Sequence, residues 1–174
     1  MLTNLLLYEV LRCLLLLLLL RLSLRLQILQ DNHTPCLIYQ GCYNLINREP
    51  EEMGVLKQAK ENGAGFIVFS PLAQGLLTDR YLNGIPADSR IAHGGHLKQE
   101  ALTEKRLNQI RALNEIALRR GQTLAEMALS WILKDEHVTS VIVGSSSVGQ
   151  LEKNLKALNC APFSAEELLE IESL

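Results

Sequence analysis

The stretch that most constrains the fold is Gly65-Phe66-Ile67-Val68-Phe69, an apolar pentapeptide that ends abruptly at Ser70-Pro71. Its length and its β-branched and aromatic content predict a buried strand. Residues 36–40 and 138–144 have a similar composition, so we expect three strands in all, each apolar on both faces. Helical patterns separate the three segments, which predicts parallel pairing and an α/β fold.

Each predicted helix has a recognisable start or stop. Apolar residues recur at helical spacing over residues 49–63 and 102–120, and a glycine follows the second of these segments. Thr123 with Glu126, and Ser164 with Glu167, have the spacing of capping boxes and predict the first turns of two more helices. Between those two, residues 150–158 predict a further helix. Trp131, on the helix after Thr123, is interpreted as a packing residue.

The chain begins with a leucine-rich segment, and 16 of the first 29 residues are leucine. The longest part without charge runs only from Cys13 to Leu20, whereas a membrane span needs about 20 apolar residues. The first charge is Glu9 and no Ala-x-Ala cleavage site follows, so a secretory signal is not favoured either. We therefore expect residues 1–26 to be foreign to the fold, from a truncated or misframed reading, and residues 27–174 to form it.

Charge and cysteine content narrow the class of protein. The net charge is −2 and no basic stripe is present, so nucleic-acid binding is not expected. The four cysteines form no CxxC pair, which predicts reduced thiols and a cytoplasmic protein. His93 and His96 lack a third ligand nearby, so we expect no metal site.

Three segments together identify a family. They read FSPLAQGLLTDRYLNGIPADSR from residue 69, GQTLAEMALSWILKD from residue 121, and VTSVIVGSSSVGQLEKNL from residue 138. In this order they resemble the C-terminal half of the aldo-keto reductases, and most of all the branch of L-glyceraldehyde 3-phosphate reductases and potassium-channel beta subunits. A complete (β/α)8 TIM barrel needs about 250 residues, so the resemblance implies a partial barrel formed by the last three β/α units.

The resemblance assigns NADP(H)-binding roles to residues at the ends of the first two strands. It implies that Gln40 hydrogen-bonds the nicotinamide carboxamide and that Phe69 stacks on the ring. By residue type alone, Gln40 could equally face water and Phe69 could belong to the core. The segment that would wrap the pyrophosphate consists of Ser70, Pro71, Leu72, Gln74, Gly75 and Leu76.

Two arginines follow that segment, on either side of the turn signal Gly84-Ile85-Pro86. By position, Arg80 and Arg90 would hold the cofactor phosphates, and arginine suits this role because its planar fork stays charged. The alternative is a pair of solvated arginines. One departure from the family is Gly41, which stands where proline is usual and predicts a looser loop.

The exit from the third strand contains Gly144 and leads into the predicted helix of residues 150–158. A helix N-terminus offers free N–H groups to phosphate. The resemblance implies that Ser146 and Gln150 bind the adenosine 2′-phosphate, that Asn154 contacts the adenine, and that Gly144 also belongs to the cofactor-binding residues. The lysine-serine or lysine-threonine pair of a P-loop is missing, which argues against nucleotide triphosphate hydrolysis. A second departure is Lys153, where the family commonly has glutamate.

The functional expectation is therefore a fragment of an NADPH-dependent reductase of small aldehydes or ketones. The family's catalytic aspartate, tyrosine, lysine and histidine come from earlier strands, and nothing in residues 1–36 matches those motifs, so we assign no catalytic residue. The alternative is a non-catalytic NADP(H)-binding or interaction protein that resembles the channel beta subunits.

Overall fold

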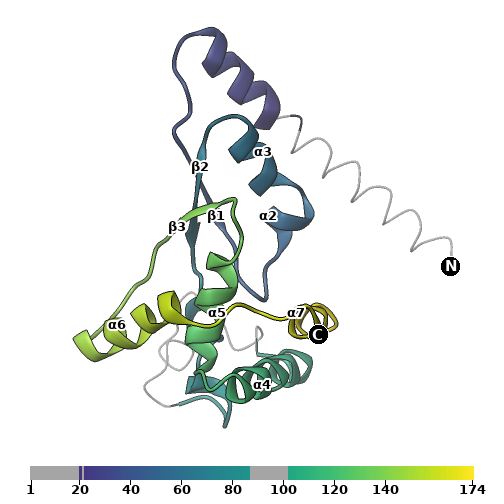
Figure 1. Ribbon diagram of the computed structural model, residues 1–174, viewed down its shortest axis with the longest axis vertical. Coiled ribbons are helices and arrows are strands. Elements are labelled where there is room, and N and C mark those ends of the chain that lie inside the picture. The colour runs from purple at the N-terminus through teal and green to yellow at the C-terminus, as the bar shows by residue number, and fades with distance from the viewer. Residues whose placement is uncertain (1–19, 21, 87–101) are drawn as a thin grey trace, which may run out of the picture.

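A three-stranded parallel sheet lies at the centre of the molecule (Figure 1). The computed structural model describes residues 20, 22–86 and 102–174 of the 174-residue chain. The strands, in spatial order, are β1 (Ile38–Cys42), β2 (Gly65–Phe69) and β3 (Val138–Val141). Helices connect them, and the predicted α/β fold with parallel pairing is confirmed.

Strands β1 and β3 do not end at the residues that the sequence predicts, because pairing with β2 determines where each of them ends. β1 continues to Cys42, which lies opposite Phe69, so Gly41 belongs to the strand and Gln40 lies two residues before its end. β3 ends at Val141, although the amide of Ile142 still donates to the Val68 carbonyl at 2.8 Å. The residue types within a short segment do not indicate which residues of a neighbouring strand it pairs with.

The predicted helix of residues 49–63 is two helices, because Gly54 has a φ of 71° between them. Both predicted capping boxes, Thr123 with Glu126 and Ser164 with Glu167, are confirmed. The α-helices are α2 (Glu49–Glu52), α3 (Val55–Glu61), α4 (Glu104–Arg119), α5 (Leu124–Leu133), α6 (Val148–Leu155) and α7 (Ala165–Glu172). Short 3-10 turns are η1 (Ala73–Gly75), η2 (Asp79–Tyr81) and η4 (Lys156–Asn159).

One face of the sheet forms the core with the helices. Phe66 and Val68 of β2 are completely buried there, as are Ile110 of α4 and Met127 of α5. Trp131 is 1% exposed, so its predicted packing role is confirmed.

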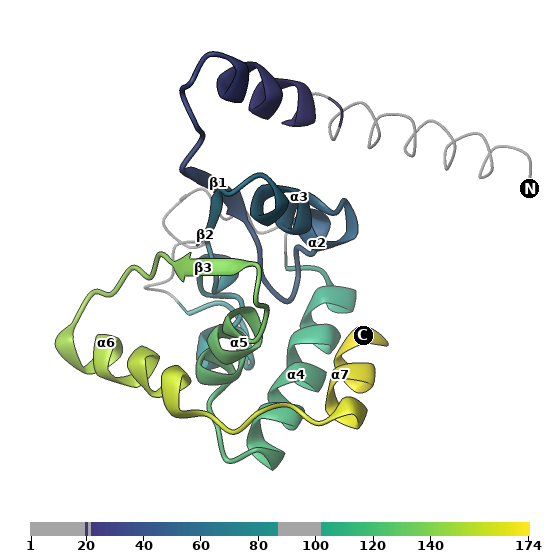
Figure 2. The same ribbon diagram turned by 45° about the horizontal axis from the view of Figure 1, so that its top comes forward.

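The N-terminal helical residues, 22–31, lie at one end of the molecule (Figure 2). They pack against the rest of the fold through Leu26, which is 4% exposed, and through Leu22, which contacts the core. Ser23 also accepts a hydrogen bond from Gln58 of α3. Part of the segment predicted to be foreign therefore contributes buried surface.

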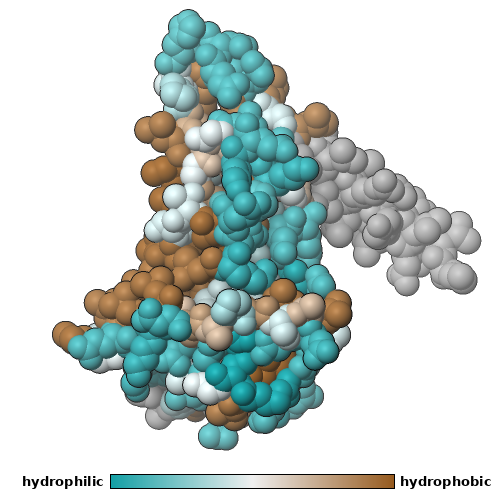
Figure 3. Space-filling view, viewed as in Figure 1, coloured by the Kyte–Doolittle hydropathy of each residue, from teal (hydrophilic) through white to brown (hydrophobic). Residues whose placement is uncertain are grey.

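The other face of the sheet is not covered by described residues. Ile38, Phe69 and Ile142 are 57%, 39% and 49% exposed, so apolar side chains of strands that are apolar on both faces reach the surface here. Apolar residues also gather on the side formed by β3 and α6 (Figure 3). Within the described part of the chain, no helix has the length and apolar character needed to cross a membrane.

Candidate cofactor-binding site

Gln40 and Phe69 lie on the face of the sheet that no described residue covers. In the register of β1 and β2, Gln40 lies opposite Ile67 and Cys42 lies opposite Phe69. Residues two apart in a strand share a face, so Gln40 and Phe69 are on the same side of the sheet. Both predicted residues are exposed, so Phe69 is not part of the core and Gln40 faces outward. The two side chains therefore share a surface on which a flat ring could lie against the phenylalanine and beside an amide.

The loop after β2, residues 70–77, has an unusual backbone. Three of its non-glycine residues have positive φ angles: Ser70 at 52°, Ala73 at 47° and Gln74 at 59°. Such angles cost about 1–3 kcal/mol each and persist only where the surroundings enforce them, often at ligand sites. Four backbone hydrogen bonds close the turn, and the two shortest run from the amide of Ala73 to the Ser70 carbonyl (3.0 Å) and from that of Gly75 to the Leu72 carbonyl (2.8 Å).

The predicted residues of this loop divide into anchors and exposed groups. Pro71 and Leu76 are buried, and Leu72 packs against the core, so these three side chains hold the loop down. Gln74 is exposed and Gly75 has a φ of 101°. A ligand on this loop would therefore meet backbone groups and the Gln74 side chain.

Thr78 closes the loop and positions the first arginine. Its hydroxyl donates to the Gly75 carbonyl at 2.7 Å and accepts from the amide of Arg80 at 3.2 Å. This cap starts η2, where Tyr81 is buried and Arg80 is exposed. Arg90, like His93 and His96, lies outside the described residues, so the arginine pair stays a prediction.

The exit from β3 brings two predicted phosphate ligands together. The amide and the hydroxyl of Ser146 both donate to Gln150 Oε1, at 2.8 and 3.0 Å. Ser147 caps α6 by accepting from the amide of Gln150. Gly144, also predicted to bind, is exposed, with no atom within 4 Å of an added Cβ, so crowding does not require glycine there.

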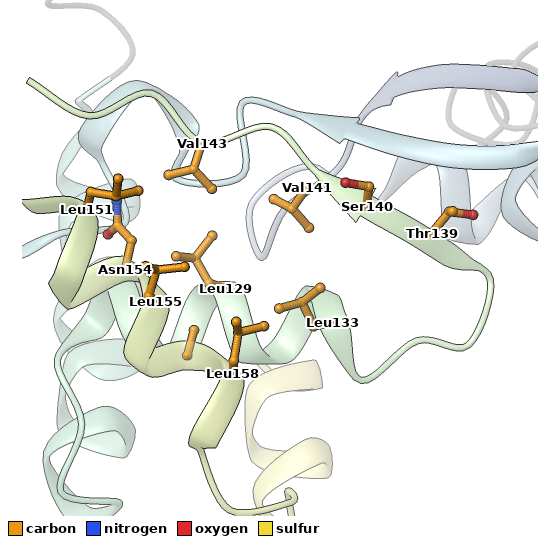
Figure 4. A pocket seen from close by; sticks show the side chains of 11 residues that line it. Leu129, Leu133, Thr139, Ser140, Val141, Val143, Leu151, Asn154, Leu155 and Leu158 are labelled. Carbon is orange, nitrogen blue, oxygen red and sulfur yellow. The ribbon is translucent and has the colours of Figure 1, made fainter.

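A pocket of about 260 Å³ lies between β3, α5 and α6 (Figure 4). Leu151 and Leu155 of α6 lie opposite Val141 and Val143, so most of the wall is apolar. Asn154 contributes an amide to it. This side chain is 7% exposed and donates to Ser145 Oγ at 3.4 Å. The lining suits a weakly polar ring better than a phosphate.

Asn44 is a residue of this region that the sequence analysis missed. It follows β1, is 3% exposed, and donates through Nδ2 to the Ser70 carbonyl at 2.9 Å. Its Oδ1 accepts from the amides of Ile46 and Asn47. An asparagine two residues after a strand is a turn signal, but the contact with a loop 26 residues away leaves no local pattern.

Tyr43, the residue before Asn44, is not accessible as a catalytic acid. It is completely buried, and its hydroxyl donates to Glu51 Oε2 at 3.1 Å. Burial, assisted by the Glu51 carboxylate, raises the pKa of Tyr43 above its ordinary value of 10.0. Among the described residues, no group of three or more His, Cys, Asp or Glu side chains is placed to hold a metal ion.

Comparison with known proteins identifies relatives over most of the chain. Residues 23–174 match the model of the Aldo/keto reductase family. An L-glyceraldehyde 3-phosphate reductase of Escherichia coli O157:H7 is 53% identical over 150 residues, which are 84% of this chain and 43% of that protein. A probable voltage-gated potassium channel subunit beta of Oryza sativa subsp. japonica is 35% identical over 137 residues, covering 77% and 42%.

A solved structure gives the same indication. The crystal structure of a thermostable aldo-keto reductase, Tm1743, in complex with the inhibitor epalrestat superimposes with a TM-score of 0.55 at 28% identity. The match covers 78% of this chain and 39% of the other. The chain thus spans less than half the length of the relatives it matches.

Proposed function

We propose, from the premise that this chain belongs to the aldo/keto reductase family, that it forms the NADP(H)-binding part of a reductase of small aldehydes or ketones. The observation that carries the proposal is the placement of Gln40 and Phe69 on one open face of the sheet. The strands are parallel, so the exit loops of β2 and β3 leave from the same edge. That edge is where barrel enzymes hold their ligands.

A bound nicotinamide cofactor would supply a hydride for reduction of a carbonyl carbon. In this proposal Phe69 presents one face of the ring and Gln40 fixes its amide, which sets the orientation. Backbone groups of residues 70–76 would meet the pyrophosphate, since peptide N–H groups bind phosphate where the backbone can approach closely. Arg80 and Arg90 would add positive charge.

Preference for NADP(H) over NAD(H) is proposed for the loop after β3. Ser146 and Gln150 already share a hydrogen bond at the start of α6, where the helix dipole favours an anion. The amide and hydroxyl of Ser146 would turn from Gln150 Oε1 to the 2′-phosphate, and Gln150 would offer its side-chain Nε2. Asn154, in the wall of the neighbouring pocket, would meet the adenine.

We further propose that the chain is a partial barrel, the last three of eight β/α units, and lacks the catalytic residues. Three parallel strands and a coverage of 39–43% of each matched protein support this view. The proposed location is the cytoplasm. A second candidate is a non-catalytic NADP(H)-binding or interaction protein, which the 35% identity to a channel beta subunit supports.

A fluorescence titration of NADPH with the purified chain tests the cofactor proposal. We expect saturable binding that Phe69→Ala weakens about tenfold or more, and weaker binding of NADH at the same salt concentration. Leu118→Ala is the control, since Leu118 is 59% exposed on α4, outside the site. Absence of NADPH binding, equal affinity for NADH, or equal loss in both variants would contradict the proposal.

A further inference from the structure

A side-chain hydrogen bond joins the loop after β1 to the loop after β2. Asn44 Nδ2 donates to the Ser70 carbonyl at 2.9 Å, across 26 residues of sequence. That carbonyl also accepts from the amide of Ala73 at 3.0 Å. Ser70 is thus held at its carbonyl from two directions, at the position where the chain leaves β2.

The backbone conformation of Ser70 is one that such a contact can stabilise. Its φ of 52° lies in the left-handed region, which is unfavourable for a residue with a Cβ. Within the loop, the bond from the Ala73 amide to the Ser70 carbonyl opposes a return of Ser70 to an extended conformation. If the chain continued extended at Ser70, the turn of residues 72–75 would not form where it does.

Asn44 is itself rigidly held. It is 3% exposed, and its Oδ1 accepts from the amides of Ile46 (2.9 Å) and Asn47 (2.8 Å). Both functions of the amide group are therefore used, the oxygen locally and the nitrogen across to Ser70. An acceptor in place of the nitrogen would keep the local turn and lose the bridge.

We propose that Asn44 is a positioning residue that holds the loop of residues 70–77 in its left-handed turn. The consequence for ligands rests on the proposed function: the amides of this loop would face the cofactor pyrophosphate only while Asn44 holds Ser70. Phe69, the residue before Ser70, would likewise depend on Asn44 for its position at the end of β2.

Hydrogen exchange on the 174-residue chain tests the proposal without any ligand. Asn44→Asp keeps an acceptor for the Ile46 and Asn47 amides but cannot donate to Ser70. We expect the amides of Ala73, Gly75 and Leu77 to exchange at least tenfold faster, and those inside β2 to change less than twofold. Asn62→Asp is the matched control, since Asn62 Nδ2 also donates to a carbonyl, that of Gln58 at 2.8 Å, far from the loop.

Two further variants keep the test decisive. Asn44→Ser leaves a local acceptor without a buried charge and is too short to reach Ser70, so it gives the same readout if Asn44→Asp fails to fold. Adding Ser70→Gly to Asn44→Asp should slow the loop exchange at least threefold, because glycine adopts positive φ without a steric cost. Unchanged loop exchange, equal acceleration throughout β2, or no rescue by glycine would overturn the proposal.

NADPH titration of the same variants separates this inference from the proposed function. We expect Asn44→Asp to weaken binding at least fivefold and Asn62→Asp to leave it unchanged. A faster loop with unchanged NADPH binding would overturn the pyrophosphate role of residues 70–76 while the Asn44 contact stands. The two failures are therefore distinguishable.

Discussion

Gly41→Ala is the substitution for which the structure gives the clearest magnitude. A Cβ on Gly41 would lie 2.5 Å from Phe66 Cζ and 3.2 Å from Cε2. Phe66 is completely buried and its ring stacks on Tyr39 at 5.6 Å between centroids, so it has little room to move. Overpacking of this kind costs about 1–3 kcal/mol.

The pair allows a double-mutant cycle. Phe66→Leu removes the ring that would clash, at a cost of about 1–2 kcal/mol for lost apolar burial. In the double variant Gly41→Ala/Phe66→Leu the two costs should not add, and we expect a favourable coupling of about 1 kcal/mol or more. The structural reason is that leucine has no atom at the position of Cζ.

The assay is hydrogen exchange of the amides that pair β1 with β2. A loss of 1–3 kcal/mol in the free energy of opening corresponds to exchange about 5–150 times faster. Gly149→Ala is the control, because an added Cβ there meets no atom within 4 Å. Exchange in Gly41→Ala at the rate of the unmodified chain, or costs that simply add in the double variant, would refute the packing argument.

Three other predictions follow from the same structure. The isolated chain should show no NADPH-dependent reduction of glyceraldehyde or methylglyoxal, because a proton donor is needed and Tyr43 is buried; turnover abolished by Phe69→Ala would contradict this. Deletion of residues 1–19 should raise solubility. Extension of the deletion to residue 26 should lower the free energy of unfolding by roughly 2 kcal/mol, because it removes the buried Leu26, and should therefore lower the melting temperature. Equal melting temperatures for the two deletions would count against this role of Leu26. The hydrogen bond from the Ser164 amide, together with Arg120, lowers the pKa of Glu167 below 4.5, so the stability that its carboxylate provides should be lost as the pH falls below that value. In melting curves the gap between the unmodified chain and Glu167→Gln should therefore narrow from pH 5.5 to pH 3, and a constant gap would be inconsistent with the ion pair.

The sequence predicted those parts of the fold that depend on neighbours in the chain. Strand β2 and both capping boxes were located correctly because their signals lie within a few residues. The ends of β1 and β3 were misplaced because pairing with β2 sets them. Gly41 was interpreted as a looser loop, yet it lies inside β1, where the Phe66 ring takes the space of a side chain.

The residues of the candidate site also fall into those that the sequence predicted and those that it could not. Resemblance to a family pointed to Gln40 and Phe69, and the strand register places them on one face. Asn44 could not be found because its contact joins two loops that only the fold brings together. The anchoring of the β2 exit loop by Pro71 and Leu76 was also missed, since a family motif does not separate buried anchors from exposed groups.

The central claim is that one NADP(H) molecule binds across the exits of β2 and β3. A titration of the isotopically labelled chain with NADPH, followed by amide chemical shifts, tests it most directly. We expect Gln40, residues 69–76 and residues 144–154 to shift together with a single dissociation constant. Shifts confined to one of the two loops, or two different dissociation constants, would contradict the claim.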